Sequence, residues 1–310
     1  MTTTCDSSIT SSGQGRVRRP ASSERRLAML KRCGLFGNDT RGAVVTRACR
    51  WAELAAAYRL VHDAFVEKQY MLPRSSGTRV RPFETDRRTA TFVAMADGEV
   101  VGVQSLVVDS DDLGLPSGHV FPVEIGSLWD PGRLVCEATN EAVAPAFRRS
   151  AVPTELMRCL YAHAVRLGCN ELITTVSPGH KAFYEYMGFE QIGSERSFST
   201  EVDDPVVLMC WHLDTVEERY GQVDPAEDTL AGFLKRFYIT GNRYVEHIDG
   251  WMNLGESLFD DAEGVGSFFR QCPELFQDAT PNELEAIRRR LGPVGFALAC
   301  MGLESAAMSA

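Results

Sequence analysis

The stretch CEATNEAVAPAFRRSAVPTELMR, residues 136–158, decides the predicted fold. It begins as a strand, breaks at Pro145, passes two arginines and enters a helical pattern. A strand, a tight turn and a helix N-terminus form an anion cradle, because backbone N–H groups and the helix dipole converge on one point. Such cradles usually use glycine, yet here Arg149, Ala151 and Pro153 stand in its place. The sequence therefore raises the question of which phosphorylated donor this turn accepts.

Length and composition limit the possible number of domains and the class of protein. With 310 residues, of which 44% are hydrophobic, the chain is long enough for one large domain or two modest ones. Its longest apolar runs, such as 205–213, fall short of the roughly 20 residues of a membrane span. The first 30 residues lack the apolar core of a secretory signal, and the nine cysteines show no metal-binding spacing. We therefore expect a cytoplasmic protein with no membrane span and no metal site, whose cysteines are small buried hydrophobic residues.

The charge is uneven along the chain. Residues 1–50 contain ten Lys/Arg and three Asp/Glu, a net charge of +7, which leaves 22 and 39 for the remainder, a net charge of −17. A basic arm can attract nucleic acid, an anionic membrane or an acidic protein, or it can be a solvated tail. The chain opens with small polar residues, so residues 1–42 are predicted to be a disordered basic arm. We expect no nucleic-acid partner.

The middle of the chain alternates between strand-like and helix-like patterns. In chain order they are strand 43–49, helix 51–66, a hairpin about Asp97-Gly98, strand 133–143, helix 153–168, strand 171–176, a short helix ending at Gly188, and a last strand pair within 189–214. A helix of crossover length joins the strands at 133–143 and 171–176, so they should be parallel and diverge at their ends. Residues 43–215 are thus predicted to be one α/β domain, and residues 216–310 a helical region packed on it.

This order of elements resembles the GNAT acyltransferase superfamily over roughly residues 43–214. EAVAPAFRR (141–149) is similar to the superfamily's strand-four signature, and HKAFYEYMGF (180–189) is similar to its closing Tyr…Gly-Phe element. The resemblance implies a mixed sheet flanked by helices, in which strands four and five splay and the pantetheine arm of the acyl donor lies in the gap. Another α/β fold is the structural alternative.

A second resemblance is narrower. YRLVHDAFVEKQYM (58–71), the hairpin with DGEVVG (97–102) and LPSGHVFPVE (115–124) are similar to the N-acyl amino acid synthases, relatives of the acyl-homoserine lactone synthases. The resemblance implies an N-acyltransferase that moves a long-chain acyl group from a phosphopantetheine thioester to the amine of an amino acid. The donor substrate is then acyl-ACP or acyl-CoA, with no permanently bound cofactor, and acyl carrier protein is an expected partner. It leaves open which amino acid or other small amine is the acceptor.

The resemblance also assigns catalytic residues. Glu137 lies six residues before Val143, where some superfamily members keep a general base, and burial could raise its pKa as that role requires. Glu141, expected on the same strand face, is the alternative base. Tyr184 matches the tyrosine that often protonates the leaving thiolate. The structural alternatives are a solvated or salt-bridged strand residue for Glu137 and a core tyrosine for Tyr184.

The donor is expected to contact the turn. The candidate residues are Val143, Arg148, Arg149, Ser150, Ala151 and His180. Pro153 has no N–H group, so a diphosphate cradle is compromised, but two arginines can still bind the single phosphodiester of a carrier-bound phosphopantetheine. His180 contacts the pantetheine, caps the helix or belongs to the core. Arginines of the arm, namely Arg16, Arg18, Arg19, Arg25 and Arg26, are expected to steer an acidic carrier.

Two other functions remain open. One is a conventional GNAT N-acetyltransferase that uses acetyl-CoA, which intact glycines in the turn would have favoured. The other is a non-catalytic GNAT-like binding module whose basic arm or helical region contacts a partner.

Overall fold

The computed structural model describes residues 23–32 and 34–301. Within the predicted arm, Ser23–Arg32 form helix α1. Arg16, Arg18 and Arg19 lie outside the described residues. None of the helices in the described ranges has the length and apolar character that a bilayer crossing requires.

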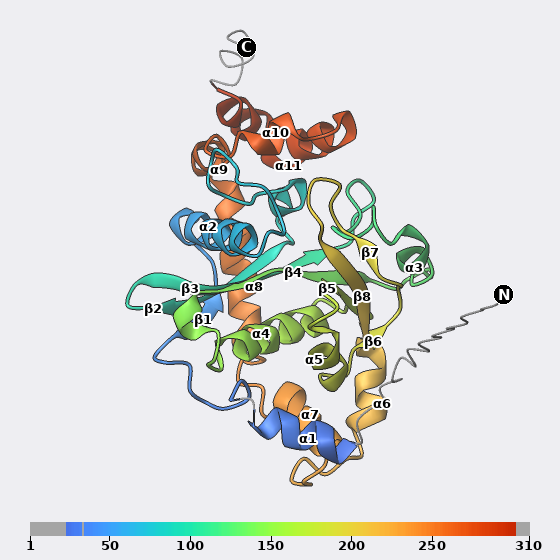
Figure 1. Ribbon diagram of the computed structural model, residues 1–310. Coiled ribbons are helices and arrows are strands. Elements are labelled where there is room, and N and C mark those ends of the chain that lie inside the picture. Colours follow the sequence, from blue (N-terminus) through green and yellow to red (C-terminus); the bar gives the residue numbers. More distant parts are fainter. Residues whose placement is uncertain (1–22, 33, 302–310) are drawn as a thin grey trace, which may run out of the picture.

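Within the described residues, a mixed eight-stranded sheet crosses the middle of the molecule (Figure 1). Its order is β1-β2-β3-β4-β5-β8-β6, with β7 paired to β8. The strands are β1 (Val44–Arg47), β2 (Ala90–Ala96), β3 (Glu99–Val108), β4 (Val135–Val143), β5 (Glu171–Val176), β6 (Glu190–Gln191), β7 (Arg196–Ser197) and β8 (Pro205–His212). Only the pair of β4 and β5 is parallel among the described strands. The predicted mixed α/β sheet is confirmed.

The two parallel strands part as predicted. Their pairing runs from Val135 opposite Glu171 to Ala138 opposite Thr174. Beyond this point β4 continues to Val143, whereas the end of β5 pairs only with β8. The second half of β4 is therefore not paired with β5.

Helices cover both faces of the sheet (Figure 1). On one face, Leu156 and Leu160 of α4 (Val152–Arg166) pack in the same cluster as Phe92 and Leu106 of the sheet. On the other face, α2 (Trp51–Glu67) packs on Val93 and Val103. The helices that fill the rest of this core are α3 (Pro122–Gly126) and α5 (Lys181–Tyr186), with the 3₁₀ turns η1 (Pro82–Thr85) and η2 (Pro145–Phe147).

Residues 189–200 were predicted to form one continuous strand, and this prediction was wrong. Only the two short strands β6 and β7 form there. Between them Gly193 approaches the ring of Phe121 so closely that a Cβ atom would lie 2.8 Å from two ring carbons. The chain bends past this ring, and glycine permits the approach.

From residue 216 to residue 301, where the description ends, the chain is mainly helical, as predicted. The short turn η3 (Leu213–Thr215) leads into this region, whose elements are α6 (Val216–Tyr220), α7 (Leu230–Lys235), the π-helical turn η4 (Arg236–Thr240), α8 (Ile248–Ser257), η5 (Leu258–Asp260), α9 (Ala262–Phe269), α10 (Glu274–Gln277) and α11 (Pro281–Ala299). The last helix is kinked at Gly292, whose φ is 69° and which precedes Pro293.

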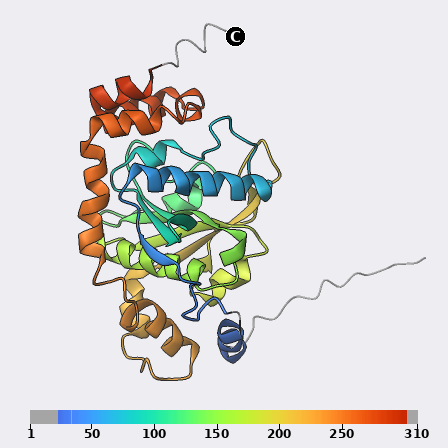
Figure 2. The same ribbon diagram turned by 90° about the vertical axis from the view of Figure 1, so that its left-hand side faces the viewer.

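These helices pack against the core along one edge of the sheet and at both of its faces. Figure 2 shows α8 running along the edge of the sheet, between α7 at one face and the group α9 to α11 at the other. Arg47 of β1 fixes α8 by donating to the carbonyl groups of Trp251 and Met252, at 3.1 and 3.0 Å. The C-terminal region therefore touches both faces of the core.

Candidate active site

A β-bulge in β4 turns the two candidate bases to opposite faces of the sheet. Val103 of β3 is opposite Ala142 and Ser105 is opposite Thr139, so one residue of β3 faces two residues of β4, Asn140 and Glu141. Asn140 adopts a positive φ of 55° there. An extra residue reverses the alternation of side chains beyond it. The prediction that Glu137 and Glu141 share one face is wrong for this reason.

Glu137 is buried on the face covered by α2 and α3. Its residue is 1% exposed, and its Oε2 accepts hydrogen bonds from the N–H of Ser117 at 2.9 Å and from its hydroxyl at 2.8 Å. Burial raises the pKa of Glu137 to about 7, against the opposing effects of the Ser117 hydrogen bonds and of Arg81 and Arg79. A carboxyl group with this pKa exchanges its proton near neutral pH.

A buried polar network lies beside Glu137. Asn140 accepts a hydrogen bond from Arg79 and donates to Glu84 at 2.9 Å, while Arg81 pairs with Glu84 at 2.6 Å. Burial acts to raise the pKa of Glu84, but Arg81 and its hydrogen bonds outweigh it and keep this pKa below its usual value. The network therefore contains one carboxylate, that of Glu84, and the two guanidinium groups of Arg79 and Arg81. Sequence reasoning missed it, although Arg81 and Glu84 have capping-box spacing.

Glu141 and Tyr184 meet where β4 and β5 have parted. The hydroxyl of Tyr184, from α5, donates to Oε2 of Glu141 at 2.7 Å. Glu141 is exposed as a residue, yet the protein atoms crowding its carboxyl group raise its pKa against the effect of the Tyr184 bond. Burial, and then the Glu141 charge, raise the pKa of Tyr184 well above its usual value, so the phenol keeps its proton at neutral pH. Tyr184 is thus both buried in the core and bonded to a candidate catalytic group.

In the turn between β4 and α4, the backbone N–H groups donate hydrogen bonds to acceptors of the protein itself. The N–H of Ser150 donates to the carbonyl of Phe147 at 3.1 Å, that of Ala151 to the carbonyl of Asp39 at 2.8 Å, and that of Val152 to the Ser150 hydroxyl at 3.2 Å. Pro153 has no N–H group. These four positions offer no free backbone donor to a phosphate.

The two arginines of the turn differ. Arg148 is held by Glu67 of α2 through two hydrogen bonds of 3.1 and 2.5 Å, and its Nε donates to the carbonyl of Val143 at 3.0 Å. Arg149 is exposed and has no ion-pair partner among the described residues. His180 is exposed at the N-cap position of α5, with its Nδ1 2.9 Å from the Ser177 hydroxyl. Of these side chains, Arg149 is the cation available to a ligand.

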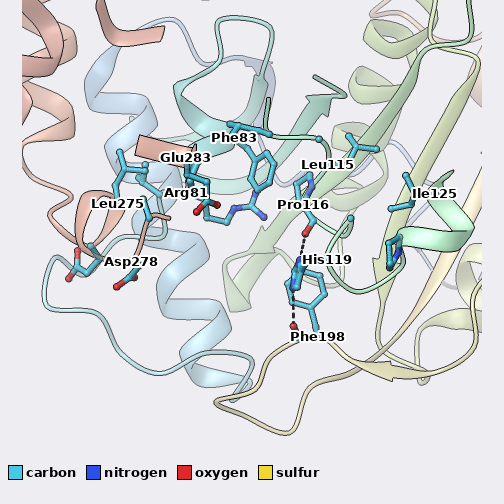
Figure 3. A pocket seen from close by; sticks show the side chains of 18 of the residues that line it. Arg81, Phe83, Leu115, Pro116, His119, Ile125, Phe198, Leu275, Asp278 and Glu283 are labelled. Carbon is cyan, nitrogen blue, oxygen red and sulfur yellow. Dashed lines mark hydrogen bonds between the residues drawn. The ribbon is translucent and has the colours of Figure 1, made fainter. Parts of the chain in front are cut away.

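A pocket of about 570 Å³ lies on the Glu137 face (Figure 3). Leu275, Asp278 and Glu283 of the C-terminal region line one side, and Leu115 and Pro116 of the loop before α3 line the other. Further lining residues are Val80, Arg81, Phe83, Gly118, His119, Ile125, Trp129, Phe198 and Ala279. Its size is typical of small-molecule sites.

The pocket adjoins Glu137. Pro116 and Gly118 line it, and Ser117 between them holds the Glu137 carboxylate. The charged lining residues have protein partners: Arg81 pairs with Glu84 and Arg74 with Asp278, while the carboxylates of Glu274 and Glu283 accept hydrogen bonds from the hydroxyls of Ser75 and Thr280. The remaining lining is mainly apolar. Sequence reasoning missed this pocket because its walls come from four distant segments.

One side-chain cluster in the described residues has ligand types suited to a metal ion. Glu171, Cys210 and His212 lie together at the start of β5 and the end of β8. The Glu171 carboxylate already pairs with Arg133, and its other oxygen lies 2.7 Å from Nδ1 of His212. A metal ion would have to displace these partners.

Comparison with known proteins identifies relatives of this arrangement. The sequence profile of the family described as N-acyl amino acid synthase FeeM matches residues 56–212. No curated protein sequence matches the chain. The structure of FeeM, an N-acyl amino acid synthase from uncultured soil microbes, is 22% identical, covers 56% of this chain and 91% of its own, and superposes with a TM-score of 0.50. This similarity confirms the predicted GNAT-like fold.

Acyl-homoserine lactone synthases are also similar. The CoA-dependent synthase BjaI is 20% identical, with 63% of this chain and 99% of BjaI covered and a TM-score of 0.46. The synthase LasI is 14% identical, with 55% and 89% covered and a TM-score of 0.43.

Proposed function

The chain belongs to the FeeM family of N-acyl amino acid synthases, and we propose that it transfers a long-chain acyl group from carrier-bound phosphopantetheine to the amine of an amino acid. Membership makes it an N-acyltransferase and sets aside the non-catalytic binding module. The donor, the acyl chain and the catalytic residues are inferred from the site.

The β4–α4 turn carries the proposal for the donor. A CoA diphosphate needs several converging N–H donors, whereas the donors at residues 150–152 are already used. A carrier-bound pantetheine brings one phosphodiester, which a single exposed guanidinium such as that of Arg149 can bind. Arg148 contributes by fixing the turn to Glu67 rather than by binding phosphate.

The pocket supports a long acyl chain. Its lining is mainly apolar once the paired charges are set aside, and its volume far exceeds what an acetyl group needs. Burying each CH₂ group of a chain is worth about 0.8 kcal/mol. A long-chain substrate can therefore use this pocket for binding energy, and this observation disfavours the acetyltransferase alternative.

The two carboxylates take different roles in the proposed mechanism. The amine attacks the thioester carbon, and Glu137 receives the amine proton through the Ser117 hydroxyl bonded to it. Collapse of the tetrahedral intermediate breaks the C–S bond, and Tyr184 gives its proton to the departing thiolate. Glu141 holds the Tyr184 hydroxyl in the opening between β4 and β5 until then. Solvent afterwards returns a proton to Tyr184 and accepts the proton held by Glu137.

The reaction product tests this proposal. Purified protein is incubated with carrier protein loaded with acyl chains of two to sixteen carbons and with a mixture of amino acids, and amides are identified by mass spectrometry. We expect long-chain N-acyl amino acids. Formation of N-acetyl products alone would support the conventional acetyltransferase instead.

A further inference from the structure

A segment before the first strand lies on the β4–α4 turn. We call residues 35–41 the strap. The carbonyl of Asp39 accepts the N–H of Ala151 at 2.8 Å, and the carbonyl of Leu35 accepts the hydroxyl of Thr154 in the first turn of α4. Arg41 donates from its guanidinium to the carbonyl of Ala146. The strap therefore contacts the turn on both sides of the start of α4.

An aromatic anchor holds the strap in place. The ring of Phe36 stacks on Phe183 of α5 with a centroid distance of 6.0 Å. It also meets Phe233 and Phe237 of the C-terminal region edge-on, at 5.3 and 5.2 Å. Such aromatic pairs contribute beyond the area that they bury. The anchor joins the strap to α5 and to the C-terminal region.

The strap also changes the charge at the turn. Its Asp39 is exposed, and the carboxylate accepts the N–H of Arg41 at 2.9 Å. A helix N-terminus attracts anions through free N–H groups and its dipole. Here a carbonyl of the strap takes one of those donors, and a carboxylate lies on the same residue. Both effects oppose the binding of a diphosphate.

We propose that the strap is a donor-selecting element, which covers the phosphate-binding end of α4 and excludes the nucleotide diphosphate of acyl-CoA. This inference rests on the proposed acyl transfer from a pantetheine thioester. A donor that ends in pantetheine, or that carries one phosphodiester, reaches the opening between β4 and β5 without displacing the strap. Phe36 is the residue that determines this selectivity, because it anchors the strap.

The test compares two donors with the same long acyl chain, acyl-CoA and acyl-pantetheine, in the full-length protein. With the strap in place, we expect the KM for acyl-CoA to be equal to or higher than that for acyl-pantetheine, since the nucleotide gains no contacts. Phe36→Ala should lower the KM for acyl-CoA by about tenfold, the effect of one or two charge-assisted hydrogen bonds. The KM for acyl-pantetheine should stay unchanged.

Matched variants separate this effect from a loss of folding. Phe36→Leu keeps an apolar anchor and should behave as the native protein, and Phe296→Ala removes an aromatic ring that packs on Phe276, away from the strap. Thr154→Val removes the bond to Leu35 without touching the anchor and should shift the KM in the same direction as Phe36→Ala. Thermal unfolding confirms that each variant is folded.

Two results would overturn the inference. One is a native KM for acyl-CoA at least tenfold below that for acyl-pantetheine, because the diphosphate would then bind with the strap in place. The other is a folded Phe36→Ala and a folded Thr154→Val that both leave the ratio of the two KM values unchanged. Absence of amide product from either donor would instead contradict the proposed function.

Discussion

Glu137 carries the proposed base chemistry, and its surroundings explain why. The spacing to Val143 led to this residue from the sequence, and the structure buries it with a pKa raised to about 7. Its partner Ser117 is 20 residues away in a loop, and no pattern in the sequence connects the two. The bulge at Asn140 was equally hidden, because a strand pattern of period two does not reveal a single inserted residue.

Replacing Glu137 tests its role through the rate and its pH dependence. A base must be deprotonated, so kcat/KM of the native protein, calculated for the neutral form of the amine, should fall about tenfold per pH unit below about 7 and reach a plateau above it. Glu137→Gln should lower the plateau by roughly 10²–10⁴-fold and abolish this inflection. Tyr184→Phe should lose less and keep the inflection, since solvent can partly replace a general acid. Single-turnover assays with a fixed donor provide the measurement.

The exposed Glu285→Gln serves as the control and should keep the native profile. An inflection near pH 7 that persists in Glu137→Gln would transfer the role of base to another group, with Glu141 the first to examine.

At the scale of elements, the sequence predicted those helices and strands whose structure depends on local residue patterns. Periodicity, Pro153 near the start of α4 and Gly168 after its end fixed that helix, and the length of this crossover fixed the parallel pair β4–β5. The hairpin at Asp97-Gly98 has the two positive φ angles, 52° and 84°, that such turns need. The pocket could not be predicted in the same way, because its walls are brought together only by tertiary packing.

The connection between α10 and α11 should limit the length of the acyl chain. Ala279 lines the pocket, so Ala279→Phe adds a ring to the volume in which the chain is proposed to lie. We expect the preferred chain to shorten by several carbons, with little change in kcat for the shorter donors. Competition between donors of mixed chain length, read by mass spectrometry of the products, measures the shift.

Val294→Phe adds the same ring at an exposed position of α11 and should leave the chain preference unchanged. An unaltered preference in Ala279→Phe would show that the acyl chain lies elsewhere.

At the scale of the whole molecule, the region that matches the family profile and the segments outside it have different proposed roles. The family profile spans residues 56–212, which hold Glu137, Glu141, Tyr184 and the turn. The strap, its anchors Phe233 and Phe237, and the C-terminal wall of the pocket all lie outside this range. The proposed catalytic groups thus lie in the matched region, while the elements proposed to select the donor and the chain lie outside it. The sequence predicted a helical region over residues 216–310, which is confirmed for the described residues up to 301, but it did not predict this role.

The preferred acyl donor distinguishes the proposed function from a conventional acetyltransferase. We propose to measure kcat/KM for one long acyl chain presented on acyl carrier protein and on CoA, with native protein, Arg149→Ala and the control Arg59→Ala, an exposed arginine of α2. We predict that the carrier-bound donor is preferred, that Arg149→Ala reduces this preference and that Arg59→Ala does not. Rising salt should weaken the reaction with the carrier, because exposed charges are screened beyond about 8 Å at physiological ionic strength. Equal use of both donors by all three proteins, or activity with acetyl-CoA alone, would contradict it.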